Sequence, residues 1–556
     1  MTEFESSNIL DGGKLLFEPT SGGLGYEIFH ALNRYKGKIV QRIVPTGEVD
    51  YYEDLLQRSI RTAIYFRKIN LKREDIVCLC CGNNFNSLDP LIASKFVGSN
   101  YTSIDKLQPE KDLLYILNFL EPRIIFIEED DDLKFQEYSK QFPFECEIIV
   151  FGKSNAFTNF SQLMTYSDEE VDFRPIFIED ISETAIVFTS SGTTDNAKGI
   201  CLSHYSVLGH IFNVFNASYH RGTMRFSNFT HKFSDADDLK FMFFSPMYWI
   251  TGTYFSLGMI FSGGSRVVGS SFNAEEVWNA LEKYLPDTIF LPSGQMSALC
   301  RYASNRPPNT FLEIFLTSAV RMTETHVQKF KKCFPKGHLL QCYGQTENSG
   351  LIASFHIGIP GDLKLQEIYS TSCGRPLTGF QIKIVSVDKG IICGPMEQGE
   401  VMMKNKFIMN GYFKKDSSFA FDADGWFKSG DLGYFDENHF LYILERVDDL
   451  IYYKNQFFSP SIIENILTQH PAVLEGFVFG YPHPTDKQHP MAVVVLKEEF
   501  KNKVQGDEII SFVNEKITDD MYKIRAGIKI VDKLLKTQSS KFKRIPMRRL
   551  ILAGEF

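Results

Sequence analysis

Positive charge is in short supply in this 556-residue sequence, which has 59 lysines and arginines against 68 aspartates and glutamates. The resulting net charge of −9 gives the chain no general electrostatic attraction to nucleic acid or to an anionic membrane. The apolar runs of the chain are short, and none of them would span the hydrocarbon core of a bilayer. These absences argue against a nucleic-acid-binding protein and against transmembrane helices.

Cysteine is sparse, and the spacing of the 10 cysteines forms no Cys/His set for a metal ion. Cys78, Cys80 and Cys81 lie in an apolar, strand-like run, where cysteine behaves as a small hydrophobic residue. Scattered cysteines in a long chain are typical of a reducing compartment. The acidic N-terminus lacks the apolar segment of a signal peptide, and the C-terminus does not match an S-K-L peroxisomal address. We therefore expect a cytoplasmic protein, with the peroxisome as the alternative.

The composition is that of a globular protein. Apolar residues make up 44% of the chain and charged residues 23%, and the length allows several domains. Phenylalanine is abundant, with 50 residues. Such a number suits large apolar cores, and it also suits an apolar ligand pocket.

Helical and strand patterns alternate over residues 50–150. Apolar residues at helical spacing predict helices at Tyr51–Lys68 and Leu88–Val97, and apolar runs predict strands at Asp75–Cys81 and Arg123–Glu128. Strands that alternate with helices favour a parallel α/β sheet. The alternation returns after residue 239, where four strands and two helices are predicted: Lys240–Phe244, Arg266–Gly269, Thr288–Leu291 and Glu313–Leu316 as strands, Glu275–Tyr284 and Glu324–Cys333 as helices.

The pattern changes in the last third of the chain. Residues Gly374–Gly433 contain short strands with frequent glycines, which are typical of a small β-barrel or sheet. The segment beyond Glu445 is a compact α/β mixture of about 110 residues, the size of a small domain. We therefore predict an α/β protein with a large N-terminal domain of parallel and mixed sheets plus a small β-barrel-like part (residues 1–445), and a small α+β C-terminal domain (residues 446–556).

A hydroxyl-rich loop, Thr189–Gly199, follows the buried strand predicted at Ala185–Phe188. Gly192 lets the backbone approach a ligand closely, and Lys198 supplies a positive charge. Backbone amides and hydroxyls of such a loop can surround phosphate oxygens, whereas the alternative is a solvated Ser/Thr/Gly turn. It is not a P-loop, because its lysine does not stand in a G-K-[ST] triplet before a helix. The candidate phosphate-binding residues are Thr189, Ser190, Ser191, Gly192, Thr193, Thr194 and Lys198.

Four further segments follow this loop along the chain: Tyr343–Glu347 (YGQTE), Ser429–Tyr434 (SGDLGY), Glu445–Ile451 (ERVDDLI) and Lys536–Lys541 (KTQSSK). Taken individually, each could be a turn or a solvated charge. In this order and spacing they resemble the motifs of the adenylate-forming superfamily, which includes acyl-CoA synthetases, coumarate-type CoA ligases and beetle luciferases. The resemblance extends from about Val49 to Leu552. Met224–Ser227 (MRFS) and the pair Tyr248 and Trp249 resemble the luciferase and insect acyl-CoA synthetase branch.

The resemblance implies a two-step reaction. A carboxylic acid attacks the α-phosphate of ATP to give acyl-AMP and pyrophosphate, and the thiol of coenzyme A then displaces AMP. ATP, Mg²⁺ and coenzyme A would be required, and aromatic residues such as Tyr248 and Trp249 would line an acyl pocket for a medium- or long-chain fatty acid. The first step brings an anion onto a polyanion, so the placement of cations is the main catalytic need. The motifs imply no oligomeric state.

The resemblance also assigns roles to single residues. The loop Thr189–Gly199 would hold the β- and γ-phosphates, and Thr346 would bond the α-phosphate. Glu347 would hold Mg²⁺, which bridges phosphates. Tyr343 would lie beside the adenine. The ribose would be bound by Asp431, whose carboxylate can accept two hydrogen bonds, and by Arg446.

One site cannot hold both half-reactions at once. In the family the C-terminal domain rotates between two poses, and Lys541 reaches over the α-phosphate only during adenylation. Asp448 falls at the hinge position, where an exposed polar residue can absorb a backbone change without loss of core packing. A solvated basic tail is the alternative reading of Lys541.

Some positions depart from the family pattern. Asp195 brings a negative charge into the phosphate loop, and Ser540 replaces a glycine beside Lys541. Asn455 also replaces a glycine, in a segment that lines the coenzyme A channel in the family. Two alternatives to an acyl-CoA ligase therefore remain open: an adenylating enzyme that has an impaired or different acyl acceptor, and a non-catalytic nucleotide- or lipid-binding relative.

Overall fold

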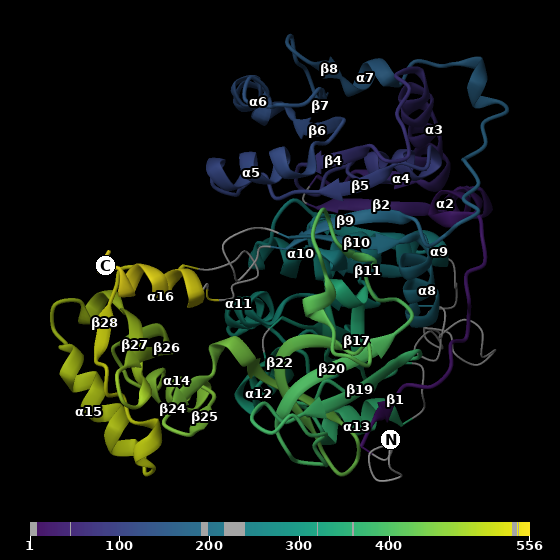
Figure 1. Ribbon diagram of the computed structural model, residues 1–556. Helices are drawn as coiled ribbons and strands as arrows, with labels where there is room; N and C mark the ends of the chain where they lie inside the picture. Colours follow the sequence, from purple (N-terminus) through teal and green to yellow (C-terminus); the bar gives the residue numbers. More distant parts are fainter. Residues whose placement is uncertain are drawn as a thin grey trace.

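The computed structural model shows a body built of several sheets, with a separate C-terminal domain beside it (Figure 1). Among the described residues, no helix combines the length and the apolar character needed to cross a membrane. The structure describes residues 8–44, 46–190, 198–215, 239–319, 321–357, 361–535, 542 and 544–555.

An eight-stranded sheet forms the upper part of the body in Figure 1, in the order β21-β10-β9-β5-β4-β6-β7-β8. Strands β9, β5, β4, β6, β7 and β8 run parallel to one another, whereas β10 is antiparallel to both β9 and β21. Buried apolar residues such as Ile124–Ile127 fill both faces. The strands are β4 (Ile76–Cys80), β5 (Asn100–Ser103), β6 (Ile124–Glu128), β7 (Glu147–Phe151), β8 (Thr158–Asn159), β9 (Thr184–Ser190), β10 (Lys198–Ser203) and β21 (Gly411–Tyr412).

A seven-stranded sheet has the order β15-β14-β13-β11-β12-β2-β3 and is parallel except for the edge strand β3. Helices connect the parallel strands from β11 to β15 in turn, as expected for parallel strands. The strands are β2 (Ile39–Val44), β3 (Val49–Tyr51), β11 (Lys240–Phe243), β12 (Ser265–Gly269), β13 (Thr288–Phe290), β14 (Ile314–Thr317) and β15 (His338–Gln341).

Two antiparallel sheets complete the body, and their labelled strands lie below the eight-stranded sheet in Figure 1. The five-stranded one is the small β part that the sequence predicts, and it carries two of the strands on which the candidate site is built. It consists of β1 (Leu10–Asp11), β19 (Phe380–Val385), β20 (Gly399–Asn405), β22 (Phe427–Phe435) and β23 (Leu441–Arg446). The three-stranded one consists of β16 (Tyr343–Gln345), β17 (Gly350–Ser354) and β18 (Arg375–Pro376).

Helices pack between and around the sheets of the body. Every residue of α4 is buried, including Lys95, whose ammonium donates to the carbonyls of Ser99 and Ala185. Burial lowers the pKa of Lys95 to about 7. The helices are α2 (Gly23–Arg34), α3 (Tyr52–Lys68), α4 (Asp89–Phe96), α5 (Glu110–Leu120), α6 (Asp132–Ser139), α7 (Phe160–Leu163), α8 (His204–Phe215), α9 (Ile250–Ser262), α10 (Ala274–Tyr284), α11 (Ser293–Ala303), α12 (Glu324–Cys333) and α13 (Asp362–Ile368).

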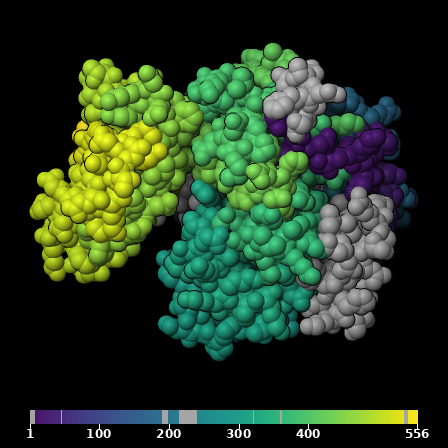
Figure 2. Space-filling view, turned by 90° about the horizontal axis from the view of Figure 1, so that it is seen from below, coloured from purple at the N-terminus to yellow at the C-terminus, as the bar shows by residue number. Residues whose placement is uncertain are grey.

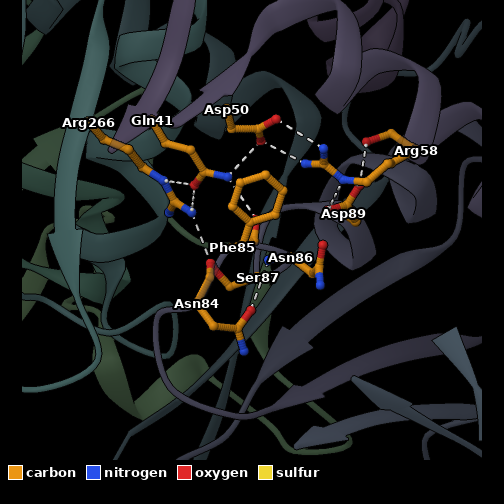
Figure 3. A network of polar contacts seen from close by, with 10 residues as sticks. Gln41, Asp50, Arg58, Asn84, Phe85, Asn86, Ser87, Asp89 and Arg266 are labelled. Carbon is orange, nitrogen blue, oxygen red and sulfur yellow. Dashed lines mark hydrogen bonds and ion pairs between the residues drawn. The ribbon is translucent and has the colours of Figure 1, made fainter. Parts of the chain in front are cut away.

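A buried polar network joins the seven-stranded sheet to α3 and α4 (Figure 3). The Arg266 guanidinium donates to the Gln41 carbonyl oxygen at 2.6 and 3.0 Å, and the Gln41 amide donates to Asp50 at 2.7 Å. Asp50 accepts two bonds from Arg58, whose Nε lies 3.4 Å from Asp89. The buried Arg266 and the half-buried Arg58 are thus balanced by two buried carboxylates, which holds these elements in register.

The C-terminal domain has its own sheet, in the order β25-β24-β27-β26, with β28 paired to β27. Separate hydrophobic clusters cover its two faces, and Figure 2 shows it as a lobe beside the body. A short 3-10 turn, Val447–Asp449, connects it to β23. Its elements are β24 (Ile451–Tyr453), β25 (Gln456–Phe458), α14 (Ser461–Leu467), β26 (Val473–His483), β27 (Lys487–Leu496), α15 (Gly506–Lys516), β28 (Ile528–Ile530) and α16 (Arg544–Leu552).

Candidate functional site

The Asp431 carboxylate is held by donors from two strands, β16 and β23. Asp431 on β22 stands opposite Arg446 on β23, and its Oδ1 accepts a bond of 2.8 Å from the Arg446 guanidinium. Its Oδ2 accepts from the Tyr343 hydroxyl at 2.7 Å and from the Gln345 amide at 2.5 Å. Burial and the neighbouring Asp431 charge raise the pKa of Tyr343, so its hydroxyl remains a donor. The structure therefore brings together three of the predicted residues: Tyr343, Asp431 and Arg446.

Gly430 fits this cluster for two reasons. Its backbone φ is +69°, which a residue with a side chain rarely adopts. A Cβ atom at this position would lie 2.6 Å from a terminal nitrogen of Arg446. The Ser-Gly-Asp motif thus allows the guanidinium to reach both the Asp431 carboxylate and the Ser429 carbonyl, at 2.8 and 2.9 Å.

Glu347 forms a second cluster with Tyr412 and Lys198. Glu347 lies in the 3-10 turn Thr346–Asn348 after β16, and its carboxylate accepts a long bond of 3.4 Å from the Tyr412 hydroxyl. The Lys198 ammonium lies 5.0 Å from the centre of the Tyr412 ring. Burial raises the pKa of Glu347, and the charges of Arg446 and Lys198 partly offset this effect. A half-buried carboxylate whose only side-chain bond among the described residues is this long one from Tyr412 is suited to a cation.

The predicted phosphate loop begins and ends on a β-hairpin. Gly199 pairs with Thr189 and Lys198 with Ser190, so β10 returns antiparallel to β9. This arrangement places the backbone of Thr189 and Ser190 beside the strand that carries Lys198. Thr346, half-buried, begins the same turn as Glu347. Other predicted residues lie outside the described part of the chain: Ser191, Gly192, Thr193, Thr194 and Lys541.

Tyr248 and Trp249 are half-buried at the start of α9, where Trp249 is the N-cap residue. Their ring centres lie 6.2 Å apart in an edge-on arrangement. Burial and the charge of Asp105 raise the pKa of Tyr248. The two rings thus stay close to each other at a helix terminus, but their role in an acyl pocket remains a prediction.

The segment around the predicted hinge holds a cluster of charges. Asp448 is exposed in the turn Val447–Asp449. Arg544 forms a two-point pair with Glu464, at 2.5 and 3.0 Å. Asp449 and Glu445 lie 3.7 and 3.9 Å from the same guanidinium. One arginine of the C-terminal domain thus faces three carboxylates, of which Glu445 belongs to β23 of the body.

We expect Glu445→Gln to reduce the loss of stability with rising pH. Burial raises the pKa of Glu445 from 4.5 to about 7, with Arg544 opposing the shift. Between these values the folded protein keeps a proton that the unfolded chain has released, so unfolding free energy falls as pH rises, by about 3 kcal/mol in all. Chemical denaturation from pH 5 to 8 measures this slope. A variant as pH-dependent as wild type would contradict the prediction, and Glu499→Gln, an exposed site, is the control.

Two residues of these clusters were not singled out from the sequence. Gln345 shares the Tyr343–Glu347 motif, and two-residue spacing along a strand places it on the same face as Tyr343, which is a usable signal. Tyr412 gives no such signal in the sequence, because it lies on the two-residue strand β21, which reaches the site by pairing with β10.

The polar groups gathered from β10, β16, β22 and β23 form the arrangement expected of an adenylate-forming enzyme. The family model described as AMP-binding enzyme matches residues 30–413, and the model described as AMP-binding enzyme C-terminal domain matches residues 462–541. The chain therefore belongs to the AMP-binding enzyme family.

Known relatives agree with the predicted superfamily. The solved luciferase-like enzyme of the nonluminescent mealworm Zophobas morio is 32% identical, with a TM-score of 0.71, over 79% of this chain and 99% of that one. The luciferin 4-monooxygenase of Photuris pensylvanica is 26% identical over 98% of both chains. The peroxisomal OPC-8:0-CoA ligase 1 of Arabidopsis thaliana is 24% identical over 95% of this chain and 93% of the relative. Relatives thus include both luciferase-like enzymes and CoA ligases.

Proposed function

We propose that the protein activates a carboxylic acid with ATP to give acyl-AMP, and then transfers the acyl group to coenzyme A. The observation that carries the proposal is the Asp431 carboxylate, held by Arg446, Tyr343 and Gln345 next to the Glu347 cluster. A carboxylate in this setting can accept bonds from two ribose hydroxyls, while the tyrosine lies beside the base. The names of the relatives support adenylation followed by thiol transfer, because several are CoA ligases.

Phosphate binding is assigned to the β9–β10 hairpin and the turn after β16. Lys198 supplies positive charge, and Thr189 and Thr346 supply hydroxyl groups near the same strands. The Thr189–Gly199 loop would hold the β- and γ-phosphates, and Thr346 the α-phosphate. These residues neutralise and orient a polyanion that an incoming carboxylate would otherwise repel.

The surroundings of Glu347 fit a magnesium ion. Its half-buried carboxylate accepts a backbone bond within its own residue and a long bond from Tyr412, so lone pairs remain for a cation that prefers oxygen ligands. When bound with ATP, Mg²⁺ supplies charge neutralisation of the phosphates. Glu347 holds and orients it, and Lys198 adds a fixed charge on the same side of the site.

The acid is proposed to be a medium- or long-chain fatty acid, with Tyr248 and Trp249 in the acyl pocket. Their half-buried aromatic rings at the start of α9 support an apolar substrate. A reducing compartment, and thus the cytoplasm, is supported by the ten cysteines, all of which are free thiols.

An adenylating enzyme with a different acyl acceptor is the second candidate. Asn455 is exposed in the two-residue turn between β24 and β25, and the left-handed residue of this turn is Lys454, with φ of +52°. The backbone of Asn455 therefore does not require glycine here. Its side chain instead adds bulk at the surface that would admit coenzyme A.

Pyrophosphate release from ATP and Mg²⁺ tests both candidates. The protein is offered a panel of fatty and aromatic acids, with and without coenzyme A. Release that depends on the acid and accelerates with coenzyme A supports the ligase. Release that ignores coenzyme A supports the second candidate. Folded protein that binds ATP but releases no pyrophosphate with any acid would overturn both.

We further propose two domains, residues 1–445 and 446–556, that rotate about Asp448. Asp448→Pro fixes φ in the connecting turn, and we expect it to leave one half-reaction within about threefold of wild type while the other falls by about 100-fold. Single-turnover adenylation and thiol transfer from preformed acyl-AMP measure the steps separately. Asp448→Ala is the control, because it removes the charge but leaves φ unrestricted. Equal loss in both steps would contradict a hinge at this position.

A further inference from the structure

The hairpin that joins β26 to β27 carries two histidines and an aspartate outside the clusters described above. His483 ends β26, Asp486 lies in the turn, and His489 lies on β27 opposite Tyr481. One potential metal-ligating atom of each of the three residues lies within 4.8 Å of the others. The set contains no cysteine, so the cysteine spacing gives no sign of it.

Contacts within the hairpin already orient these side chains. A ring nitrogen of His489 lies 2.9 Å from the Asp486 carboxylate, and the two imidazole rings stack with centres 3.8 Å apart. The backbone amide of Asp486 donates to Nδ1 of His483 at 3.1 Å.

We propose that His483, Asp486 and His489 form a binding site for a divalent transition metal, with zinc as its representative. Two imidazoles and one carboxylate suit zinc and its neighbours, whereas magnesium and calcium prefer sites made wholly of oxygen. Three protein ligands leave the fourth tetrahedral position to water. The donors span seven residues of one rigid hairpin, so little chain entropy is lost when they converge on an ion.

The site is coupled to the turn that holds Asn455. The amide of Lys454 donates to the Asp486 carbonyl at 2.9 Å, and the Tyr453 ring lies 5.8 Å from that of His489. A bound ion would therefore brace the β24–β25 turn against the β26–β27 hairpin. All three ligands retain some solvent exposure, so the ion can enter without unfolding.

Calorimetric titration of the full chain with zinc tests the site. The protein is first stripped with a chelator and exchanged into buffer with excess Mg²⁺, which occupies oxygen-rich sites. We expect one zinc per chain with a dissociation constant of about 1–10 µM, weaker than four-ligand structural sites. His483→Gln and His489→Gln should each weaken binding by about 100-fold or more, because loss of a second-shell partner alone costs 10- to 100-fold. His439→Gln, an exposed histidine before β23, should bind as wild type does.

A second measurement needs no variant. X-ray absorption of the zinc-loaded wild-type protein should report nitrogen and oxygen ligands that include imidazole. Sulfur ligands would assign the metal to cysteine and overturn the proposal. So would folded wild type that binds no zinc at 100 µM, or unchanged affinity in both histidine variants.

Discussion

Asp431→Asn is expected to lower kcat/KM for ATP by about 100- to 1000-fold. The Asp431 carboxylate accepts bonds from Arg446, Tyr343 and Gln345, all of which are donors. An asparagine replaces one acceptor oxygen by a donor group and leaves the Arg446 charge without its ion-pair partner. Such mismatches cost about 3–4 kcal/mol together, which corresponds to the stated range. Initial rates of adenylation at varied ATP concentration measure the effect.

The acid concentration at half-maximal rate should change little in Asp431→Asn, because the proposed acyl pocket at Tyr248 and Trp249 is built from α9 and not from β22. Asp424→Asn is the matched control, since Asp424 is exposed on the turn just before β22. Thermal unfolding of each variant separates loss of the site from loss of the fold. Equal activity in Asp431→Asn and Asp424→Asn would contradict a role for Asp431 in nucleotide binding.

Most of the fold could be predicted because its elements carry strong periodic patterns. Helix α3 was expected at Tyr51–Lys68 and is found at Tyr52–Lys68, and α12 has the expected bounds, Glu324–Cys333. Their apolar stripes face the core, and buried apolar runs gave β4 and β6 to within one residue at each end. A segment that must bury one helical stripe, or both faces of a strand, can adopt few other secondary structures.

The pairing of sheets could not be derived in the same way. Gln41 and Arg266 are 225 residues apart and lie in apolar strands, where a polar residue would ordinarily be expected to face solvent. They instead meet in the network of Figure 3, because each satisfies the buried groups of the other. Side-chain partners that are remote in sequence leave no local periodic signal.

In the candidate site, too, some residues could be predicted from the sequence and others could not. Tyr343, Asp431 and Arg446 were expected from motifs, and the structure places them in one cluster. Their motifs occupy adjacent strands or tight turns, so the local sequence limits where the side chains point. Tyr412 was missed because its place depends on pairing between β21 and β10, which are more than 200 residues apart. Motifs thus predict the residues of a site more readily than the packing that supports them.

Glu347→Gln is expected to reduce adenylation by about 100-fold or more and to raise the Mg²⁺ concentration needed for half-maximal rate. Glutamine keeps the shape and can still accept the Tyr412 hydroxyl bond, but it lacks the charge that holds a divalent cation. Titration of the rate with Mg²⁺ at saturating ATP measures the change. Glu437→Gln, at an exposed position between β22 and β23, serves as the control.

The same substitution should preserve or increase the stability of the ligand-free protein. Burial raises the pKa of Glu347, so its ionised form is disfavoured in the folded state. As pH rises from the ordinary value of 4.5 through the raised one, wild type loses stability that Glu347→Gln retains. If the Glu347→Gln variant loses activity while its unfolding free energy at pH 8 equals or exceeds that of wild type, Glu347 serves function and not stability. Parallel loss of both would instead make it a structural residue of the turn Thr346–Asn348.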